Sequence, residues 1–165
     1  LVGYLRKQLT GQVPIGEAHF LSGDAEDQNE QLRAVSAAIS SGPIDVAFVG
    51  IGENGHLAFN DPPADFTTDD PYLIVELDHM CRTQQVNEGW FPELSAVPTR
   101  AITMSIRQIM KSKQIVCTVP EERKAAAVRD CISDRLPISP ERPASILREH
   151  SACHVFLDAE SAALL

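Results

Sequence analysis

Short apolar runs rich in β-branched residues alternate along this chain with longer amphipathic segments, and this alternation restricts the fold more than any other feature. Strands are predicted over residues 44–51, 72–77, 100–104, 114–119 and 153–157. Helices are predicted over residues 24–40, 121–133 and 143–149. Strands that alternate with helices favour an α/β fold with a largely parallel sheet, because parallel neighbours need long crossover connections.

The first of these helices has a clear apolar face, and its acidic residues gather at its start, where they complement the helix dipole. Glycine and proline at positions 42 and 43 end it. The chain opens inside a helix-like stretch, LVGYLRKQL, and few strands follow. We therefore expect a three-layer, doubly wound, mostly parallel sheet of the Rossmann-like kind that lacks its N-terminal strands. Residues 1–165 would form a single α/β domain, incomplete at its N-terminus.

Composition excludes several classes of protein. With 165 residues and a formal net charge of −9, the chain lacks the clustered Lys and Arg that a nucleic-acid binder needs, so we expect no nucleic-acid partner. No apolar run approaches the roughly 18–20 residues that span a bilayer, and we expect no membrane association. The four cysteines form no C-x-x-C pair, which argues against a zinc site and favours a reducing compartment, the cytoplasm.

The stretch GIGENGHLAFNDPP follows the first predicted strand and carries most of the chemistry in the sequence. Gly52 and Gly55 let the backbone approach a ligand at the carboxyl end of that strand, although an ordinary tight turn would also use them. His56 and Asp61 can form a proton-transfer pair; a structural histidine and a plain turn are the alternatives. The residues thus indicate acid/base chemistry on a small polar ligand without naming it.

The same stretch closely resembles the signature of the glucosamine-6-phosphate deaminases (isomerases), G-x-G-x-[DN]-G-H-[IL]-[AG]-F-N-E-P. Similarity extends to the upstream EAHFLSGDAEDQNEQLRA and to the downstream VPTRAITMSIRQIMKSKQIVCTVPEERKAAAV and PASILREH, which together cover almost the whole chain. The sister family of 6-phosphogluconolactonases continues T-A-S-L-F-P after the histidine. This chain reads L-A-F-N-D-P there, which favours the deaminases.

The resemblance implies an aldose–ketose isomerisation with loss of ammonia, which converts glucosamine 6-phosphate to fructose 6-phosphate without a redox cofactor or a metal. It implies that His56 passes a proton to the ring oxygen of the sugar and that Asn54 and Asp61 orient and charge-balance the imidazole. Backbone amides around Gly52 and Gly55 would lie against the sugar.

Two basic residues are implied as further ligands of the substrate. Lys124, at the start of a later helix, would hold the phosphate together with the helix dipole; a solvated helix lysine is the alternative. Arg82 lies where the family has an arginine near the substrate, and a surface arginine is the alternative. The implied partner is a small amino-sugar phosphate, and a homo-oligomer stays open.

Departures from the family pattern limit these implications. Asn54 stands where many members have Asp, and Asp61 stands where they have the longer Glu, so we expect a shorter reach for this carboxylate. The family's phosphate loop and its D-E-Y motif, which supplies the proton-transfer base, precede the region covered here. We expect the 165-residue chain to isomerise about 10² to 10⁴-fold more slowly without that base. The alternative functions are a 6-phosphogluconolactonase-type hydrolase and a non-catalytic sugar-phosphate-binding module.

Overall fold

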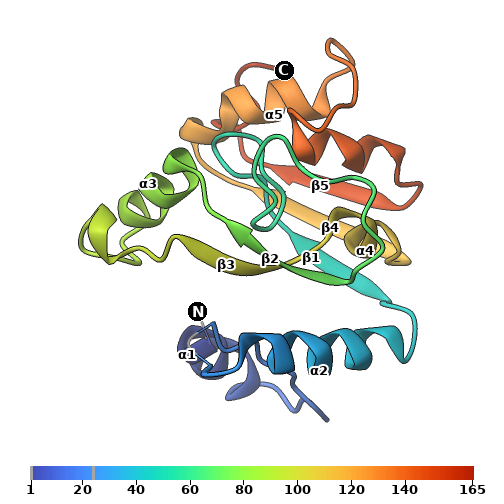
Figure 1. Ribbon diagram of the computed structural model, residues 1–165. Helices are drawn as coiled ribbons and strands as arrows, with labels where there is room; N and C mark the ends of the chain where they lie inside the picture. Colours follow the sequence, from blue (N-terminus) through green and yellow to red (C-terminus); the bar gives the residue numbers. More distant parts are fainter. Residues whose placement is uncertain (1, 24) are drawn as a thin grey trace.

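The computed structural model describes residues 2–23 and 25–165 (Figure 1). The helical elements are α1 (Val2–Leu5), the π-helix η1 (Arg6–Thr10), α2 (Gln28–Ser40), α3 (His79–Asn87), η2 (Leu94–Ala96), α4 (Ile106–Met110), η3 (Glu122–Lys124), α5 (Ala125–Ile132) and η4 (Pro143–Glu149). The strands are β1 (Val46–Val49), β2 (Tyr72–Glu76), β3 (Arg100–Met104), β4 (Gln114–Val119) and β5 (Cys153–Leu157). None of the described helices has both the length and the apolar character needed to cross a membrane.

The strands form two sheets. Strands β1, β4 and β5 build a parallel sheet in the order β1-β4-β5, with Phe48 beside Val116 and Val116 beside His154. Strands β2 and β3 pair antiparallel as a separate two-stranded sheet. The prediction of an α/β fold with a mostly parallel sheet is confirmed, and the antiparallel β2–β3 pair is a feature that the sequence pattern did not reveal.

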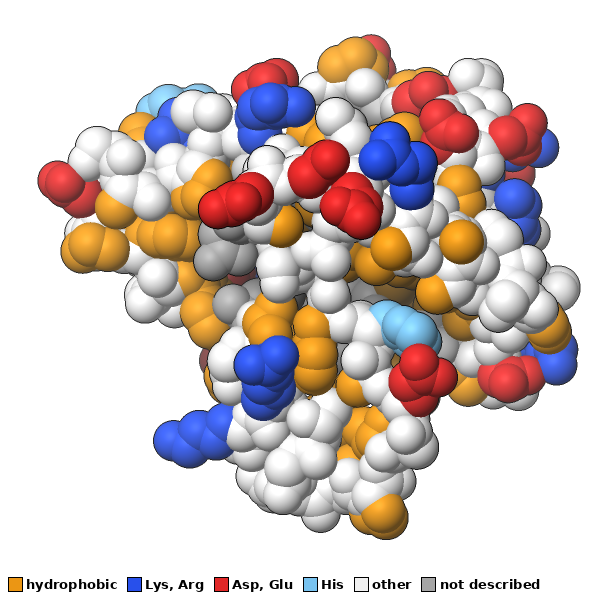
Figure 2. Space-filling view, turned by 60° about the horizontal axis from the view of Figure 1, so that its bottom comes forward, with side chains coloured by type: hydrophobic (Ala, Val, Ile, Leu, Met, Phe, Trp, Pro, Cys, Tyr) orange, Lys and Arg blue, Asp and Glu red, His pale blue; other side chains and the backbone are white. Residues whose placement is uncertain are grey.

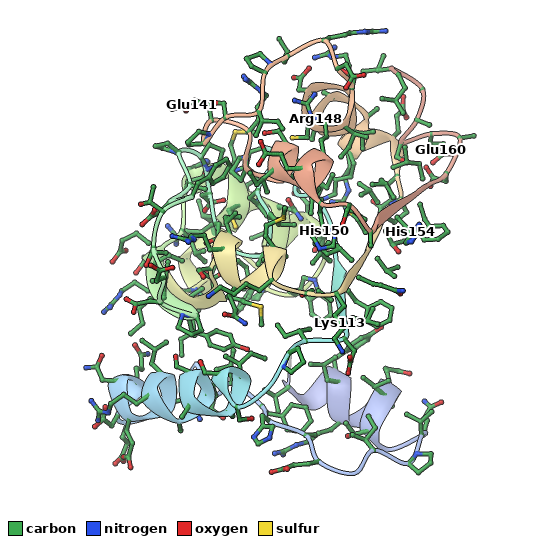
Figure 3. All side chains as sticks on the ribbon, turned by 90° about the vertical axis from the view of Figure 1, so that its right-hand side faces the viewer. Lys113, Glu141, Arg148, His150, His154 and Glu160 are labelled. Carbon is green, nitrogen blue, oxygen red and sulfur yellow. The ribbon has the colours of Figure 1, made fainter. Side chains whose placement is uncertain are left out.

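The two faces of the parallel sheet differ sharply in burial. On one face, Ile115, Cys117 and Val119 of β4 are at most 1% exposed and belong to the core, to which α4, α5 and η4 also contribute side chains. Figure 1 shows α5 and η4 above this sheet, whereas α1 and α2 lie at the opposite end of the molecule, as the side view in Figure 3 also shows. On the other face, Phe48 is 79% and Phe156 is 58% exposed.

Helix boundaries follow from capping and packing. The Asp27 side chain accepts a hydrogen bond from the Glu30 backbone N–H (2.9 Å), so α2 begins at Gln28 rather than at position 24, which lies outside the described residues. Its predicted apolar face is confirmed, since Val35 is buried. The helix predicted over 121–133 divides into η3 and α5, and the last predicted helix is the 3-10 helix η4, which Pro143 begins.

On the face shown in Figure 2, acidic and basic side chains are interspersed, and hydrophobic side chains reach the surface between them.

Candidate active site

The site is built on a compact turn that follows β1. The backbone N–H of Gly52 donates to the carbonyl of His56 (3.0 Å), and the N–H of Gly55 donates to the carbonyl of Gly52 (3.0 Å). Both N–H groups are therefore used inside the turn. Gly55 has a positive φ of 84°, and a Cβ on Gly52 would lie only 2.1–2.3 Å from the imidazole of His56. Glycine at position 52 is thus required by the histidine ring that lies against it.

A network of four polar side chains fixes the orientation of His56. The Asn54 amide nitrogen donates to Asp61 Oδ1 (3.1 Å) and to Asp78 Oδ2 (2.9 Å), which leaves the amide oxygen to face His56. That oxygen accepts from the His56 backbone N–H (3.1 Å) and lies 2.7 Å from the ring nitrogen Nδ1. The acceptor favours a proton on Nδ1, so Nε2 is the ring nitrogen that can take up or release a proton.

Asp61 supplies the negative charge of this network. Its Oδ1 lies 3.3 Å from His56 Nδ1, so the shorter side chain still reaches the imidazole. Its Oδ2 accepts from the Asp78 backbone N–H (3.0 Å). Burial raises the pKa of Asp61, but hydrogen bonds from His56, from the Asp78 backbone and from Asn54 outweigh burial and lower the pKa below its ordinary value. The carboxylate is therefore ionised at neutral pH and places a negative charge beside the imidazole of His56.

Asn60 ties the other end of the loop to the antiparallel sheet. Its buried amide nitrogen donates to the carbonyls of Leu57 (2.8 Å) and Met104 (2.9 Å). The backbone N–H of Phe59 donates to Thr103 Oγ1 (3.0 Å). Strand β3 thus holds the loop that carries His56 and Asp61.

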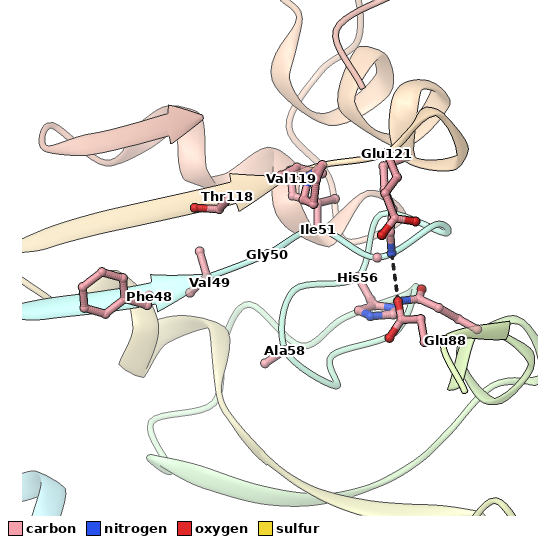
Figure 4. Close-up of a pocket in the computed structure, with 14 residues that line it drawn as sticks. Phe48, Val49, Gly50, Ile51, His56, Ala58, Glu88, Thr118, Val119 and Glu121 are labelled. Carbon is pink, nitrogen blue, oxygen red and sulfur yellow. Dashed lines mark hydrogen bonds and ion pairs between the residues drawn. The ribbon is translucent and has the colours of Figure 1, made fainter. Parts of the chain in front are cut away.

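A cavity of about 400 Å³ opens beside His56, between the carboxyl ends of β1 and β4 (Figure 4). This is the edge at which open α/β sheets bind ligands. The lining residues come from three segments that are distant in sequence: Phe48–Gly52 with His56 and Ala58, then Gln84 and Glu88, and then Thr118–Glu121 with Lys124.

Two lining residues have unusual backbone conformations. Ala58 has a φ of 55° and Glu121 a φ of 82°, although neither is glycine. Such positions cost free energy and persist only where the surrounding structure enforces them, which is frequent at functional sites. At Glu121 the backbone N–H donates to Asp158 (2.9 Å) and the carbonyl accepts from the N–H of Lys124 (3.0 Å), so this turn delivers Lys124 to the cavity.

Lys124 is a buried cation that also lines the cavity. It is 6% exposed, and its Nζ lies 3.7 Å from Glu88 Oε1. Burial lowers the pKa of Lys124, while the charges of Glu88 and Glu53 act against that shift. A buried amine with one loosely held partner is suited to bind an anion.

Arg82 lies outside the cavity lining. Its guanidinium donates to the backbone carbonyls of Leu94 (2.8 Å) and Val97 (3.1 Å), where it fastens the segment after α3. Asn54 and Asp61 lie behind His56 rather than in the lining.

Asp78, Gln84 and Glu88 contribute to the site although the sequence did not single them out. They all belong to α3 or its caps. The one local signal is Asp78 as a helix N-cap, whose side chain accepts from the Cys81 N–H (2.6 Å).

Among the described residues, His56, Asp61 and Cys81 are the group that could hold a metal, with ligand atoms within 4.8 Å of one another. Zinc would require the Cys81 thiolate. Burial, followed by the charges of Asp61 and Asp78, raises the pKa of Cys81 to about 12. The thiol therefore keeps its proton near neutral pH in the metal-free protein.

Known proteins share both this sequence pattern and this fold. A family model described as glucosamine-6-phosphate isomerases/6-phosphogluconolactonase matches residues 2–156. The glucosamine-6-phosphate deaminase of Bacillus cereus is 35% identical over 161 residues, which are 98% of this chain and 59% of that protein. That of Exiguobacterium sibiricum is 36% identical over 162 residues, 98% of this chain and 62% of the relative.

Two solved structures of related proteins superpose on this chain. A monomeric glucosamine-6-phosphate deaminase superposes with a TM-score of 0.79 at 36% identity, covering 88% of this chain and 58% of that one. A 6-phosphogluconolactonase from Trypanosoma brucei shares the fold, with a TM-score of 0.62 at 18% identity over 94% of this chain and 59% of its own. The chain spans 59% of the Bacillus cereus relative's length. The family model covers residues 2–156 of the 165 residues in this chain, and the chain therefore belongs to the glucosamine-6-phosphate isomerase/6-phosphogluconolactonase family.

Proposed function

We propose that the cavity beside His56 is the sugar-phosphate site of a glucosamine-6-phosphate deaminase, which isomerises its substrate to fructose 6-phosphate and releases ammonia. One observation carries the proposal. A single cavity is lined both by a histidine whose Nδ1 faces an amide and a carboxylate and by a buried lysine. The identity of 35% to a curated deaminase supports this reaction over others in the family.

The network around His56 suits proton transfer to and from a sugar ring. With Nδ1 occupied by Asn54, Nε2 can deliver a proton to the ring oxygen, and the pyranose then opens to its aldehyde form. Asp61 stabilises the imidazolium before this transfer. In the open chain a proton moves from C2 to C1, a step for which the family uses the base of its D-E-Y motif, which precedes the region covered here. The amine at C2 thereby becomes an imine, and its hydrolysis by water releases ammonia and leaves the ketone of fructose 6-phosphate.

Lys124 is proposed to bind the phosphate of the substrate. It precedes α5, so its ammonium and the amino end of the helix both favour an anion at this end of the cavity. The alanines that follow it in α5 offer no competing charge. Phosphate at Lys124 and the ring oxygen at His56 would place the sugar across the cavity floor, with Gly52 beneath it.

The decisive experiment measures ammonium and fructose 6-phosphate formed from glucosamine 6-phosphate. We expect His56→Asn to lower turnover by about 10² to 10⁴-fold, because it removes a positioned acid. The exposed His79 is the matched control, and His79→Asn should retain wild-type turnover.

Two results would count against the proposal. Faster hydrolysis of 6-phosphogluconolactone than of the amino sugar would favour the lactonase branch of the family. Tight binding of glucosamine 6-phosphate without turnover, in the wild-type chain and the variant alike, would favour a non-catalytic binding module.

We further infer a cytoplasmic protein. Cys81, Cys117, Cys131 and Cys153 are all free, which suits a reducing compartment. The high negative charge, −9, argues against a nucleic-acid partner.

A further inference from the structure

The carboxylate of Glu88 lies beside Lys124, the proposed ligand of the substrate's phosphate. A negative charge at this place is unexpected, because it repels a phosphate. Glu88 caps the C-terminus of α3 and lines the same cavity as Lys124 (Figure 4). Its Oε1 lies 3.7 Å from Lys124 Nζ and 3.5 Å from a terminal nitrogen of Arg123. The Lys124 side chain is 8% exposed and that of Glu88 is 24% exposed, so water screens this pair only in part.

Neutral donors hold the Glu88 carboxylate in this position. The Gln84 amide donates to Oε1 at 2.7 Å, and the Trp90 indole N–H donates to Oε2 at 3.1 Å. Gln84 is buried and is fixed in turn, because its oxygen accepts from the backbone N–H of Glu53 (3.1 Å). These two hydrogen bonds are shorter than the contact with Lys124, so the carboxylate stays in place without help from the lysine.

Carboxylates outnumber cations at this end of the cavity. Two cations, Arg123 and Lys124, are accompanied by three carboxylates, those of Glu53, Glu88 and Glu121. Two positive and three negative charges leave one net negative charge before any ligand binds. Glu53 and Glu121 contact Arg123, and Glu88 is the one of the three that also contacts Lys124.

We propose that Glu88 weakens the phosphate subsite, because its carboxylate competes with the phosphate of the substrate for the Lys124 ammonium. This inference rests on the proposed function, in which Lys124 is the phosphate ligand. Substrate and product both carry the phosphate, so the competition acts on them equally and sets how long each stays bound. Removal of the Glu88 charge should therefore lower KM and change kcat little.

Inorganic phosphate is the probe that tests the subsite without the reaction. Its affinity is measured by isothermal titration calorimetry at constant ionic strength and neutral pH, for the wild-type chain and for Glu88→Gln. We expect the variant to bind phosphate about fivefold more tightly, because the carboxylate that pairs with the Lys124 ammonium is removed and the amide keeps the shape of the side chain. Glu53→Gln removes the same charge from a carboxylate whose ion pair is with Arg123 and not with Lys124, and should give a much smaller gain.

A double-mutant cycle with Lys124→Gln separates competition for the lysine from a general charge effect. The gain from Glu88→Gln should vanish in the Lys124→Gln background. An equal gain in that background, an equal gain from Glu53→Gln, or no gain in the single variant would each overturn the proposal. Thermal unfolding of every variant verifies that it is folded.

The cycle also separates this inference from the proposed function. If wild type and Lys124→Gln bind phosphate equally, Lys124 is not the phosphate ligand. The role proposed for Glu88 is then wrong, and so is the part of the proposed function that assigns the phosphate to Lys124. If the cycle behaves as expected but no ammonium is released from glucosamine 6-phosphate, the role of Glu88 stands and the deaminase assignment fails.

Discussion

The side chain of Asp61 is only 9% exposed in the loop that carries His56, and it is nevertheless surrounded by hydrogen-bond donors. Three donors converge on its two oxygens, from His56, Asn54 and the Asp78 backbone. They favour the ionised form more than burial disfavours it, and the pKa of Asp61 is lowered in the folded state. An unfolded chain takes up a proton on this side chain at a higher pH than the folded chain does.

Asp61 should therefore make the stability of the protein depend on acid pH. Its contribution is fully present above the unfolded pKa of about 3.9 and is lost as the pH falls through the lower folded pKa. We expect Asp61→Asn to be less stable than wild type at pH 7, with the difference shrinking below about pH 4. Urea unfolding midpoints at pH 7, 5, 4 and 3 measure this, and a difference that stays constant with pH would contradict it.

Among the residues that the sequence predicted at the site, three lie close together in the chain, whereas the distant Lys124 was predicted only from the family resemblance. Asn54, His56 and Asp61 occupy one loop, so their mutual contacts follow from local spacing. Asp78 and Glu88 reach the site only because α3 packs against that loop. A single sequence contains no local signal for such a contact. Asp61, the shorter residue that stands where the family pattern has Glu, lies 3.3 Å from His56 Nδ1.

At the level of elements, α3 is the helix that joins the two halves of the site. Its N-cap Asp78 accepts from the Cys81 N–H and from the Asn54 amide, and its C-cap Glu88 faces Lys124. The histidine network and Lys124 are therefore contacted from opposite ends of one short helix.

Removal of the Asp78 side chain should cost both stability and activity. Asp78→Ala deletes the cap of α3 and frees the amide of Asn54, so we expect a loss of about 1–2 kcal/mol in the free energy of unfolding and a clear drop in turnover. Asp27 is the matched control, because it caps α2 in the same way at 2.9 Å but lies outside the site.

Asp27→Ala should lose about 1 kcal/mol of stability and retain the activity of wild type. Urea unfolding and the ammonium assay measure the two effects. Equal activity in the two variants would mean that Asp78 acts only as a helix cap.

The strands were easier to predict than the helices for a physical reason. Residues 100–104, 114–119 and 153–157 are apolar or β-branched runs bounded by polar residues, and they became β3, β4 and β5 with the same bounds. The sequence of α3, HMCRTQQVN, has few apolar residues, and α4 is only five residues long. Neither carries a clear 3.6-residue period, so their N-caps, Asp78 and Ser105, were the only signals.

At the level of the whole molecule, the core lies on one side of the parallel sheet. Ile115 on β4 is completely buried, whereas Phe156 on β5 is 58% exposed on the opposite face. The antiparallel pairing of β2 with β3 also belongs to this level, because only tertiary packing decides which strands become neighbours.

Truncations on the two faces should have very different effects. We expect Ile115→Ala to lower the free energy of unfolding by about 2–5 kcal/mol, since it removes buried methyl groups and leaves a cavity. Phe156→Ala should cost less than about 1 kcal/mol, because much of the ring is already in water. Urea unfolding of both variants compares them, and equal losses would mean that the Phe156 face is covered in solution.

The cavity is lined by three segments, around positions 48–58, 84–88 and 118–124, that meet only when the chain is folded. An unfolded chain has no such cavity, so any molecule that binds there binds the native state alone. Ligand at about 100 times its dissociation constant then adds about 2.7 kcal/mol to the stability of the fold. In a cell, the level of the molecule that binds in the cavity would therefore also help to set how long the protein survives unfolding and proteolysis.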